Sequence, residues 1–266
     1  MSEPLQRPEW DSATYHRISA PHVEWGKKVL AKLTLRGDET VLDAGCGTGR
    51  LTAELLERLP RGRVVALDIS ENMLRTARDY LQERYWGRVE FVRADLLGLP
   101  FQDRFDGIFS TATFHWVLDH DALFQNLHRA LRPGGWLCAQ CGGGPNLARL
   151  MARIESLAVR PPFSVALDEY EKPIFYTDAE AEAERLQRAG FTDIETGLES
   201  APTRLENAAA YIEFVRTVIL RHHLERLPNT GLRDLFMSEL ARQAGLDMPP
   251  YELDYWRLNM WARKQG

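Results

Sequence analysis

The feature that most constrains the fold is a glycine-rich turn, VLDAGCGTGR at residues 41–50, which joins a short apolar run to an amphipathic segment. Glycine allows the backbone to turn tightly against a ligand, and a helix that begins there directs its free N–H groups at the same point. A dinucleotide-binding turn would require a further glycine where this chain has Arg50. The carboxylate of Asp43 would repel a pyrophosphate but suits a ligand with a positive amino group. The turn therefore predicts a strand–turn–helix ligand site and disfavours NAD.

Strands and helices are predicted to alternate through the first half of the chain. Short apolar, β-branched runs predict strands at residues 40–42, 64–67, 89–92, 105–109 and 136–140. Amphipathic segments between them predict helices, and in one of these Met73, Ala77 and Leu81 share a face. A helix over residues 121–131 is expected to end at the Pro-Gly-Gly of residues 133–135. Strands in such an alternation are buried on both faces, so we predict an α/β fold with a parallel sheet between helices.

The regular alternation of predicted strands and helices ends in the second half of the chain. A capping box of Thr177 and Glu180 predicts a helix that ends at Gly190, and its charge run EAEAERLQR is predicted to be a solvated helix face. The remaining predicted elements are a strand at 192–198, helices at 206–222 and 231–244, and a final strand at 251–264. We predict one domain over residues 1–266, with a sheet core at 37–141, 174–200 and 251–266 and a lid and cap at 1–36, 142–173 and 201–250.

Two further acids end the second and third predicted strands. Asp68 is placed to accept hydrogen bonds from both hydroxyls of a ribose. Asp95 could accept from an exocyclic adenine amine, with Ile69 and Leu96 on either side of the ring. Each acid alone is more typical of a helix cap. Three acids at successive strand ends, with the glycine turn at the first, favour a nucleoside-bearing ligand.

At these residues the chain resembles the class I S-adenosylmethionine-dependent methyltransferases. The matching motifs follow the family's order and spacing across residues 37–141 and are VLDAGCGTG, ALDIS, RADLLGLPF, FDGIFS and LRPGGWL. The resemblance implies a Rossmann-like, doubly wound sheet of seven strands, mostly parallel, with an antiparallel last strand. It also implies S-adenosyl-L-methionine as methyl donor and S-adenosyl-L-homocysteine as product.

The resemblance further implies a role for individual residues. Asp43, Gly45 and Gly47 would cradle the methionine part of the donor, Asp68 the ribose, and Asp95 with Leu96 the adenine. The donor-binding residues implied in this way are Tyr15, Asp43, Gly45, Gly47, Asp68, Ile69, Met73, Asp95, Leu96 and Thr111.

Residues 110–135 look like those of a narrower subgroup, which includes trans-aconitate methyltransferase and other small-carboxylate O-methyltransferases. The segment that leaves the fourth strand lies where open α/β sheets bind ligands, so His115 and Trp116 are the candidate catalytic residues. In the subgroup the equivalent Trp is expected to hold the acceptor through its indole N–H. His115 could be a base, a second hydrogen-bond donor or a packed loop histidine.

The segments outside the sheet core are expected to form the lid and the cap. Tyr15 stands where the family commonly covers the methionine end, and His16 and His22 could face the pocket. Trp25 could do the same, but a core-facing position is favoured. Adjacent helix residues diverge by about 100°, so His222 and His223 are predicted to be surface or cap residues rather than ligands of one metal. Apolar side chains of the cap suggest either a partly apolar acceptor or packing on the sheet; they are Tyr211, Phe214, Val218 and Phe236.

Composition excludes several other classes of protein. Thirty-three Lys and Arg residues against 38 Asp and Glu residues give a net charge of −5, which disfavours nucleic acid as a partner. No apolar run approaches the roughly 18 residues of a membrane span, and the N-terminus lacks a secretory signal, so no membrane partner and a cytoplasmic location are expected. Cys138 and Cys141 form a C-x-x-C, predicted to be buried strand cysteines, and with Cys46 they disfavour a disulfide framework. No residues have metal-ligand spacing, so no metal is predicted.

The sequence thus predicts an S-adenosylmethionine-dependent methyltransferase that acts on a small molecule, with O-methylation of a carboxylate favoured. Methylation of carbon or nitrogen in a natural product is the alternative within the same chemistry. A donor-binding module without turnover and an NAD(P) dehydrogenase are the alternatives from other classes. A monomer or a homodimer is expected.

Overall fold

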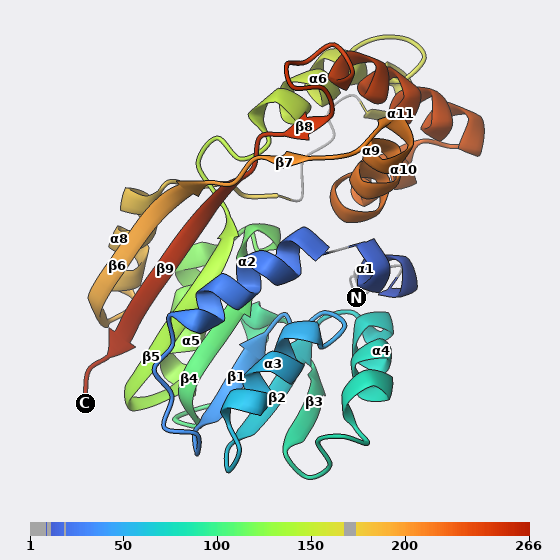
Figure 1. Ribbon diagram of the computed structural model, residues 1–266. Coiled ribbons are helices and arrows are strands. Elements are labelled where there is room, and N and C mark those ends of the chain that lie inside the picture. The colour runs from blue at the N-terminus through green and yellow to red at the C-terminus, as the bar shows by residue number, and fades with distance from the viewer. Residues whose placement is uncertain (1–8, 10–11, 19, 168–173) are drawn as a thin grey trace, which may run out of the picture.

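The computed structural model describes residue 9 and residues 12–18, 20–167 and 174–266. Seven strands form one sheet in the order β3-β2-β1-β4-β5-β9-β6 (Figure 1). They are β1 (Thr40–Ala44), β2 (Arg63–Asp68), β3 (Val89–Arg93), β4 (Phe105–Thr111), β5 (Leu131–Gly142), β6 (Phe191–Ser200) and β9 (Trp256–Lys264). The paired strands are parallel except at β9, which runs antiparallel to both β5 and β6. This topology confirms the predicted Rossmann-like sheet with its antiparallel last strand.

Helices cover both faces of the sheet because neighbouring side chains of a strand point to opposite faces. The covering helices are α2 (Ala20–Ala31), α3 (Arg50–Arg58), α4 (Glu71–Leu81), α5 (His120–Ala130) and α8 (Ala179–Arg188). Leu42 of β1 lies in one apolar cluster with Phe124 of α5. Val41, its neighbour, lies in another cluster with Leu30 of α2 and Leu56 of α3. The predicted alternation of strands and helices therefore gives three layers, with the sheet between two layers of helices.

Two predicted element boundaries are wrong. Asp178, and not Thr177, is the N-cap of α8, because its side chain accepts from the backbone N–H of Ala181 at 2.7 Å. α5 ends at Ala130, and β5 begins at the next residue, so the Pro-Gly-Gly of residues 133–135 lies within the strand. It coincides there with a register shift between β4 and β5.

A cap of short helices stands at one end of the sheet and has its own apolar core (Figure 1). It consists of α6 (Ala148–Ala158), α7 (Ser164–Leu167), α9 (Ala208–Phe214), the π-helix η3 (Val215–Ile219), α10 (Arg221–Arg226), α11 (Thr230–Ala244), β7 (Thr203–Arg204) and β8 (Glu252–Leu253). The cap residues suggested as acceptor contacts are packed in this core: Tyr211, Phe214, Val218 and Phe236. These side chains are therefore core residues, as the packing alternative predicted, but they pack within the cap itself and not on the sheet.

The cap also corrects two predicted elements. The helix predicted over residues 206–222 changes to a π-helix at Val215, and its apolar stripe continues across that change. The final strand begins at Trp256 rather than at residue 251, because residues 252–253 pair with β7 instead.

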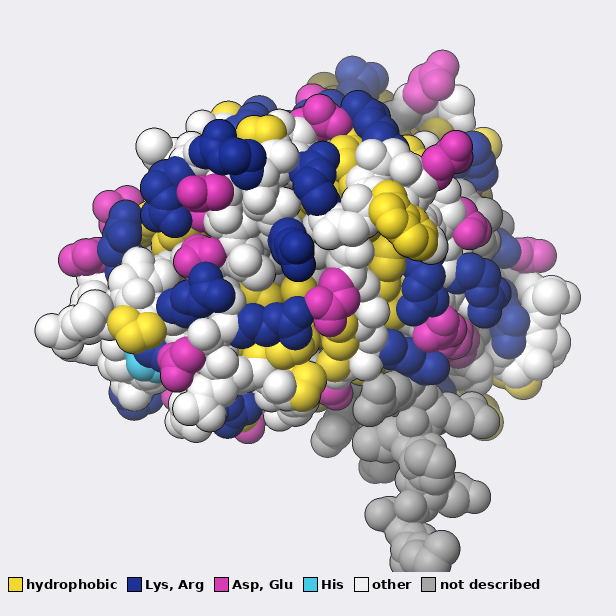
Figure 2. All heavy atoms as spheres, turned by 90° about the horizontal axis from the view of Figure 1, so that it is seen from below, with side chains coloured by type: hydrophobic (Ala, Val, Ile, Leu, Met, Phe, Trp, Pro, Cys, Tyr) yellow, Lys and Arg dark blue, Asp and Glu magenta, His cyan; other side chains and the backbone are white. Residues whose placement is uncertain are grey.

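The segment predicted to form the lid consists of α1 (Ser12–Ile18) and α2. α2 lies on the sheet with one end toward the cap, and α1 lies beside that end, in contact with α4 and with η3 of the cap (Figure 1). Arg17 of α1 forms an ion pair with Glu213 of the cap at 2.6 Å. On the face opposite the cap, basic and acidic side chains are interspersed, so neither sign dominates there (Figure 2). Within the described ranges, no helix is both long enough and apolar enough to cross a membrane.

Candidate functional site

The glycine-rich turn is packed on one side and open on the other. The N–H groups of Gly45 and Cys46 donate to the carbonyl of Leu67 at 2.8 and 2.9 Å, which fixes the turn to β2. Gly45 has φ +83°, and a Cβ there would lie 2.1 Å from Thr113 Oγ1, so only glycine fits. Gly47 has φ +54°, and a Cβ there would have no heavy atom within 4 Å. The open side leaves room for a ligand against the backbone.

Asp68 connects this turn to the start of α4. Its Oδ2 accepts from Gly47 N and its Oδ1 from Ser70 N, both at 2.9 Å. Burial raises the pKa of Asp68, although these two N–H donors oppose the rise. Glu9 reaches the same helix start, where it accepts from Ser70 Oγ at 2.9 Å and from Asn72 N at 3.0 Å. The acid predicted to bind a ribose thus also holds the turn in place.

Asp43 is a buried carboxyl at the end of β1 and is 2% exposed. Thr52 Oγ1 donates to its Oδ2 at 2.6 Å. Burial raises the pKa of Asp43 to about 7; the Thr52 hydrogen bond lowers it, and the charge of Asp68 raises it. Near neutral pH this carboxyl is therefore poised between its two protonation states.

The predicted adenine contacts lie at the ends of β2 and β3. Asp95 Oδ1 accepts from Leu97 N at 2.9 Å and caps the short 3-10 helix η1 (Leu96–Gly98). Leu96 is buried, and Ile69 is half-buried next to Asp68. Met73 is 4% exposed on the inner face of α4. Asp95 is thus a helix cap in this structure, the alternative that its position also allowed.

A small cavity separates the turn from the lid helix α2. It is lined by the turn itself, by Asp43, by Thr111 at the end of β4 and Ala112 after it, and by His22 and Val23 of α2. Burial, and then the charge of Arg257, lowers the pKa of His22 to about 3, so the ring is neutral. The cavity brings together residues that the sequence placed in the donor site and in the lid.

α1 closes over the same turn. His16 Nδ1 lies 2.9 Å from Thr48 Oγ1, and Arg50 Nη1 donates to the carbonyl of His16 at 3.0 Å. Tyr15 belongs to α1, but its side chain lies outside the described part of the chain. Trp25 of α2 packs against the cap cluster, as the core-facing interpretation predicted.

His115 and Trp116 lie in the 3-10 helix η2 (Phe114–Trp116), just after β4. His115 is 8% exposed, and its Nδ1 accepts from Gly142 N at 3.3 Å. Burial lowers the pKa of His115 well below its usual value, and the charge of Arg257 lowers it further. A ring with this low basicity is neutral and is poorly suited to remove a proton from an alcohol or a phenol.

Trp116 lies between two histidines. Its ring centroid is 5.1 Å from that of His115 and 5.7 Å from that of His222. His222 and His223 lie in α10 of the cap, one of the two positions predicted for them, but neither is a fully exposed surface residue: the ring of His222 lies beside Trp116, and His223 is 3% exposed.

The cysteines lie in the sheet as predicted. Cys138 and Cys141 are 5% and 1% exposed, and burial raises the pKa of each thiol to about 12. Both are free thiols, as is Cys46. Among the described residues, no group of three or more His, Cys, Asp or Glu side chains could hold a metal ion.

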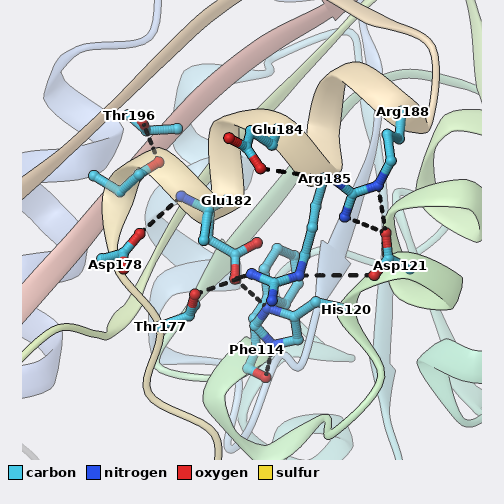
Figure 3. A network of polar contacts seen from close by, with 12 residues as sticks. Phe114, His120, Asp121, Thr177, Asp178, Glu182, Glu184, Arg185, Arg188 and Thr196 are labelled. Atoms are coloured by element: carbon cyan, nitrogen blue, oxygen red, sulfur yellow. Dashed lines mark hydrogen bonds and ion pairs between the residues drawn. The ribbon is translucent and has the colours of Figure 1, made fainter.

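A buried polar network joins η2 to α8, and sequence reasoning missed it (Figure 3). His120 Nε2 donates to the carbonyl of Phe114 at 3.0 Å, and its Nδ1 lies 2.6 Å from Glu182 Oε1. Arg185 Nη1 donates to Glu182 Oε1 at 3.4 Å and to Thr177 Oγ1 at 3.0 Å. The side chains of His120 and Glu182 are fully buried, so the charge run of α8 is not solvated throughout.

Comparisons with known proteins identify related methyltransferases. A family model described as a methyltransferase domain matches residues 41–135. A trans-aconitate 2-methyltransferase of Azoarcus sp. strain BH72 is 33% identical over 223 residues, 83% of each chain. A putative methyltransferase of Bacillus halodurans C-125 superposes with a TM-score of 0.60 at 20% identity and covers 91% of this chain and 99% of its own. A Haemonchus contortus phosphoethanolamine N-methyltransferase 2, solved with S-adenosylhomocysteine, gives 0.63 at 18% identity, covering 96% of this chain and 57% of its own.

Proposed function

The chain belongs to the class I S-adenosylmethionine-dependent methyltransferases, and from this premise we propose that it methylates a carboxylate oxygen of a small organic acid. Its methyl donor is S-adenosylmethionine. The observation that carries the choice of acceptor is the neutral His115 of low basicity beside Trp116. A carboxylate is ionised at neutral pH and needs no base, whereas an alcohol or a phenol does. The relative from Azoarcus, named for trans-aconitate, supports a carboxylic acid as acceptor.

The donor site proposed here follows the edge of the sheet. Asp43, Gly45 and Gly47 bind the methionine part, with Thr111 and the lid helix on the other side of the cavity. Asp68 accepts from the ribose hydroxyls, and the adenine lies between Ile69 and Leu96, near Asp95 and Met73. The open space at Gly47 fits this assignment, because a ligand can approach the backbone there without a clash.

The protein's contribution to the reaction is alignment and exclusion of water. When bound, S-adenosylmethionine supplies a methyl group that a carboxylate oxygen displaces in line, with S-adenosylhomocysteine as the neutral leaving group and no proton to remove. The lid helices cover the donor side of the cavity through the contacts of His16 with Thr48 and Arg50. Trp116, with its indole N–H, is the residue proposed to hold the acceptor.

We expect donor affinity to rise with pH up to about 7. The positive amino group of the donor favours the ionised form of Asp43, whose pKa is about 7 in the free protein. Below that pH a proton must leave before the donor binds, so the affinity falls, at most about tenfold per pH unit. Calorimetry with S-adenosylhomocysteine in two buffers of different ionisation enthalpy should detect release of about half a proton at pH 7. Asp43→Asn should remove this proton release. If the binding enthalpy of that variant still depended on the ionisation enthalpy of the buffer as in the wild-type protein, the assignment would be contradicted.

Trp116→Phe is expected to lower kcat/KM for the acceptor by roughly 10- to 100-fold, the effect of one lost hydrogen bond to an anion. The phenyl ring keeps the packing against His115 and His222, so affinity for S-adenosylhomocysteine should stay within about twofold. Steady-state kinetics and calorimetry measure the two quantities. Trp86→Phe is the control, because Trp86 is 77% exposed. Loss of donor affinity in Trp116→Phe would place Trp116 in the donor pocket instead.

A screen of acids, phenols and amines with methyl-labelled donor tests the proposed function directly. Methyl esters as the only products would support it. Methylated nitrogen or carbon would replace it with the alternative acceptor class. Donor binding without any product would instead favour a binding module.

A further inference from the structure

A second cavity lies between α6 of the cap and the segment that leads into α8. It has a volume of about 290 Å³. Its walls are the loop of residues 144–146 after β5, Ala148 and Met151 of α6, and Ile174 and Tyr176 before α8. Within the described ranges it has no lining residue in common with the cavity at the glycine-rich turn. The second cavity is therefore a separate site, to which the donor assignment gives no role.

One wall of the second cavity is attached to η2. Phe175 N, between the lining residues Ile174 and Tyr176, donates to the carbonyl of His115 at 2.8 Å. The ring of Tyr176 lies 5.9 Å from the ring of His115, which in turn lies 5.1 Å from the ring of Trp116. The cavity wall is thus in contact with the neighbour of the residue that is proposed to hold the reacting carboxylate.

The end of β5 makes the same connection from the other side. Gly142 N donates to His115 Nδ1 at 3.3 Å. A Cβ at Gly142 would lie 2.7 Å from Asn146 Nδ2 and 2.8 Å from Tyr176 Cε1, so the backbone approaches both lining residues closely. The second cavity and η2 therefore adjoin at Gly142, and the part of an acceptor that lies away from its reacting carboxylate is the group that the cavity is placed to receive.

The lining of the second cavity suits an apolar group. Ala148, Met151 and Ile174 contribute hydrocarbon and thioether side chains, and no charged side chain is among the described residues that line it. An ionised group would lose its hydration there without gaining a partner from the lining, whereas an apolar group gains by leaving water. The unbranched side chain of a methionine also adapts to an irregular ligand and makes favourable contacts with aromatic rings.

The polar groups and the size of the cavity agree with this. Burial raises the pKa of Tyr176 to about 12, although a hydrogen bond with Asn146 and the charge of Arg257 oppose the rise, so the phenol is neutral. Asn146 Oδ1 accepts from Trp256 N at 2.8 Å. An apolar cavity of about 150 Å³ is large enough for benzene. The volume of about 290 Å³ therefore accommodates a phenyl ring or a short hydrocarbon chain.

We propose that the second cavity binds an apolar tail of the methyl acceptor, about the size of a phenyl ring, so that the preferred acceptor is a monocarboxylic acid with such a tail. The tail lies against Met151 and Ile174, while Trp116 holds the carboxylate that reacts. The proposal rests on the proposed methylation of a carboxylate and adds to it the class of acid and the residues that select it.

The test compares 3-phenylpropanoate, propanoate and propane-1,2,3-tricarboxylate as ligands of the full chain saturated with S-adenosylhomocysteine. Calorimetry gives the dissociation constants. The wild-type protein is expected to bind 3-phenylpropanoate roughly 10- to 100-fold more tightly than propanoate, the gain from burying a phenyl group. It should also bind 3-phenylpropanoate more tightly than the tricarboxylate, which has no apolar tail.

Two variants alter the cavity in opposite directions. Ala148→Phe fills it; Ala148 is exposed at the first position of α6, so the larger side chain leaves the core of the cap intact. Met151→Ala removes a contact of the tail. Each should weaken binding of 3-phenylpropanoate by about tenfold and binding of propanoate by less than about twofold. Ala152→Phe is the matched control, since Ala152 is an exposed alanine one turn further along α6 that does not line the cavity, and it should change neither affinity.

The outcomes that overturn the proposal differ from those that overturn the proposed function. Propanoate or the tricarboxylate binding as tightly as 3-phenylpropanoate would refute the apolar tail while methylation of a carboxylate stood. So would an unchanged affinity for 3-phenylpropanoate in both cavity variants, or equal losses for the two monocarboxylates. Binding of none of the three acids would refute the proposal too, and absence of methyl esters from every acid in the screen with labelled donor would refute the proposed function. The wild-type comparison needs no variant, so it decides even if a variant does not fold.

Discussion

Asp68→Ala is expected to lower the affinity for S-adenosylhomocysteine about 100-fold. The Asp68 carboxylate accepts from the backbone N–H groups of Gly47 and Ser70 and is proposed to accept from the ribose hydroxyls as well. A hydrogen bond to a charged group contributes roughly 1.5–3 kcal/mol, and at about 1.4 kcal/mol per tenfold the loss of one or two gives this factor. The variant also frees the turn at Gly47 from the start of α4. Calorimetry gives the affinity, and a urea titration separates it from the cost in stability.

Asp106→Ala is a matched control for this experiment. Asp106 likewise accepts a hydrogen bond from a backbone N–H, because Thr40 N donates to its Oδ2 at 2.7 Å. Asp106, however, lies at the start of β4. Its replacement should lower the free energy of unfolding by about 1 kcal/mol and leave donor affinity unchanged. Equal donor affinity in Asp68→Ala and Asp106→Ala would contradict the ribose assignment.

The parts of the fold that follow from local periodicity were predictable from the sequence. Met73, Ala77 and Leu81 recur on one helix face, and all three are buried in α4. The strand order and the antiparallel direction of β9 came with the family resemblance rather than from periodicity. Residues of the glycine-rich turn were identified because the backbone conformation itself requires glycine, as the φ of +83° at Gly45 shows.

The parts of the site that depend on tertiary contacts were not predictable in this way. Glu182 has the same sequence context as the solvated acids of its helix, and only the packing of α8 against α5 buries it beside His120. The sequence allowed His222 a place in the cap, but that its ring lies beside Trp116 depends on how α10 packs against the loop after β4.

The second large effect is expected at the buried pair of His120 and Glu182 beside η2, where Glu182→Ala should lower the free energy of unfolding by about 3–5 kcal/mol. The variant leaves His120 Nδ1 without its acceptor at 2.6 Å and removes one contact of Arg185, in a region closed to water. Removing one partner of a buried pair costs this much because the other polar group stays buried. Since His120 Nε2 also holds the carbonyl of Phe114, the displaced η2 should raise KM for the acceptor while donor affinity stays nearly constant. A urea titration and steady-state kinetics measure the two effects.

Two control variants separate the pair from its helix. Glu180→Ala removes an exposed acid from the same first turn of α8, so it should change stability by less than about 0.5 kcal/mol. The double variant His120→Leu with Glu182→Leu replaces both partners by apolar groups, and it should regain much of the lost stability because neither polar group is then buried alone. KM for the acceptor should nevertheless stay raised in the double variant, since the Phe114 carbonyl loses its hydrogen-bond donor there too. If Glu182→Ala were no more destabilising than Glu180→Ala, the network would not be what holds η2 in place.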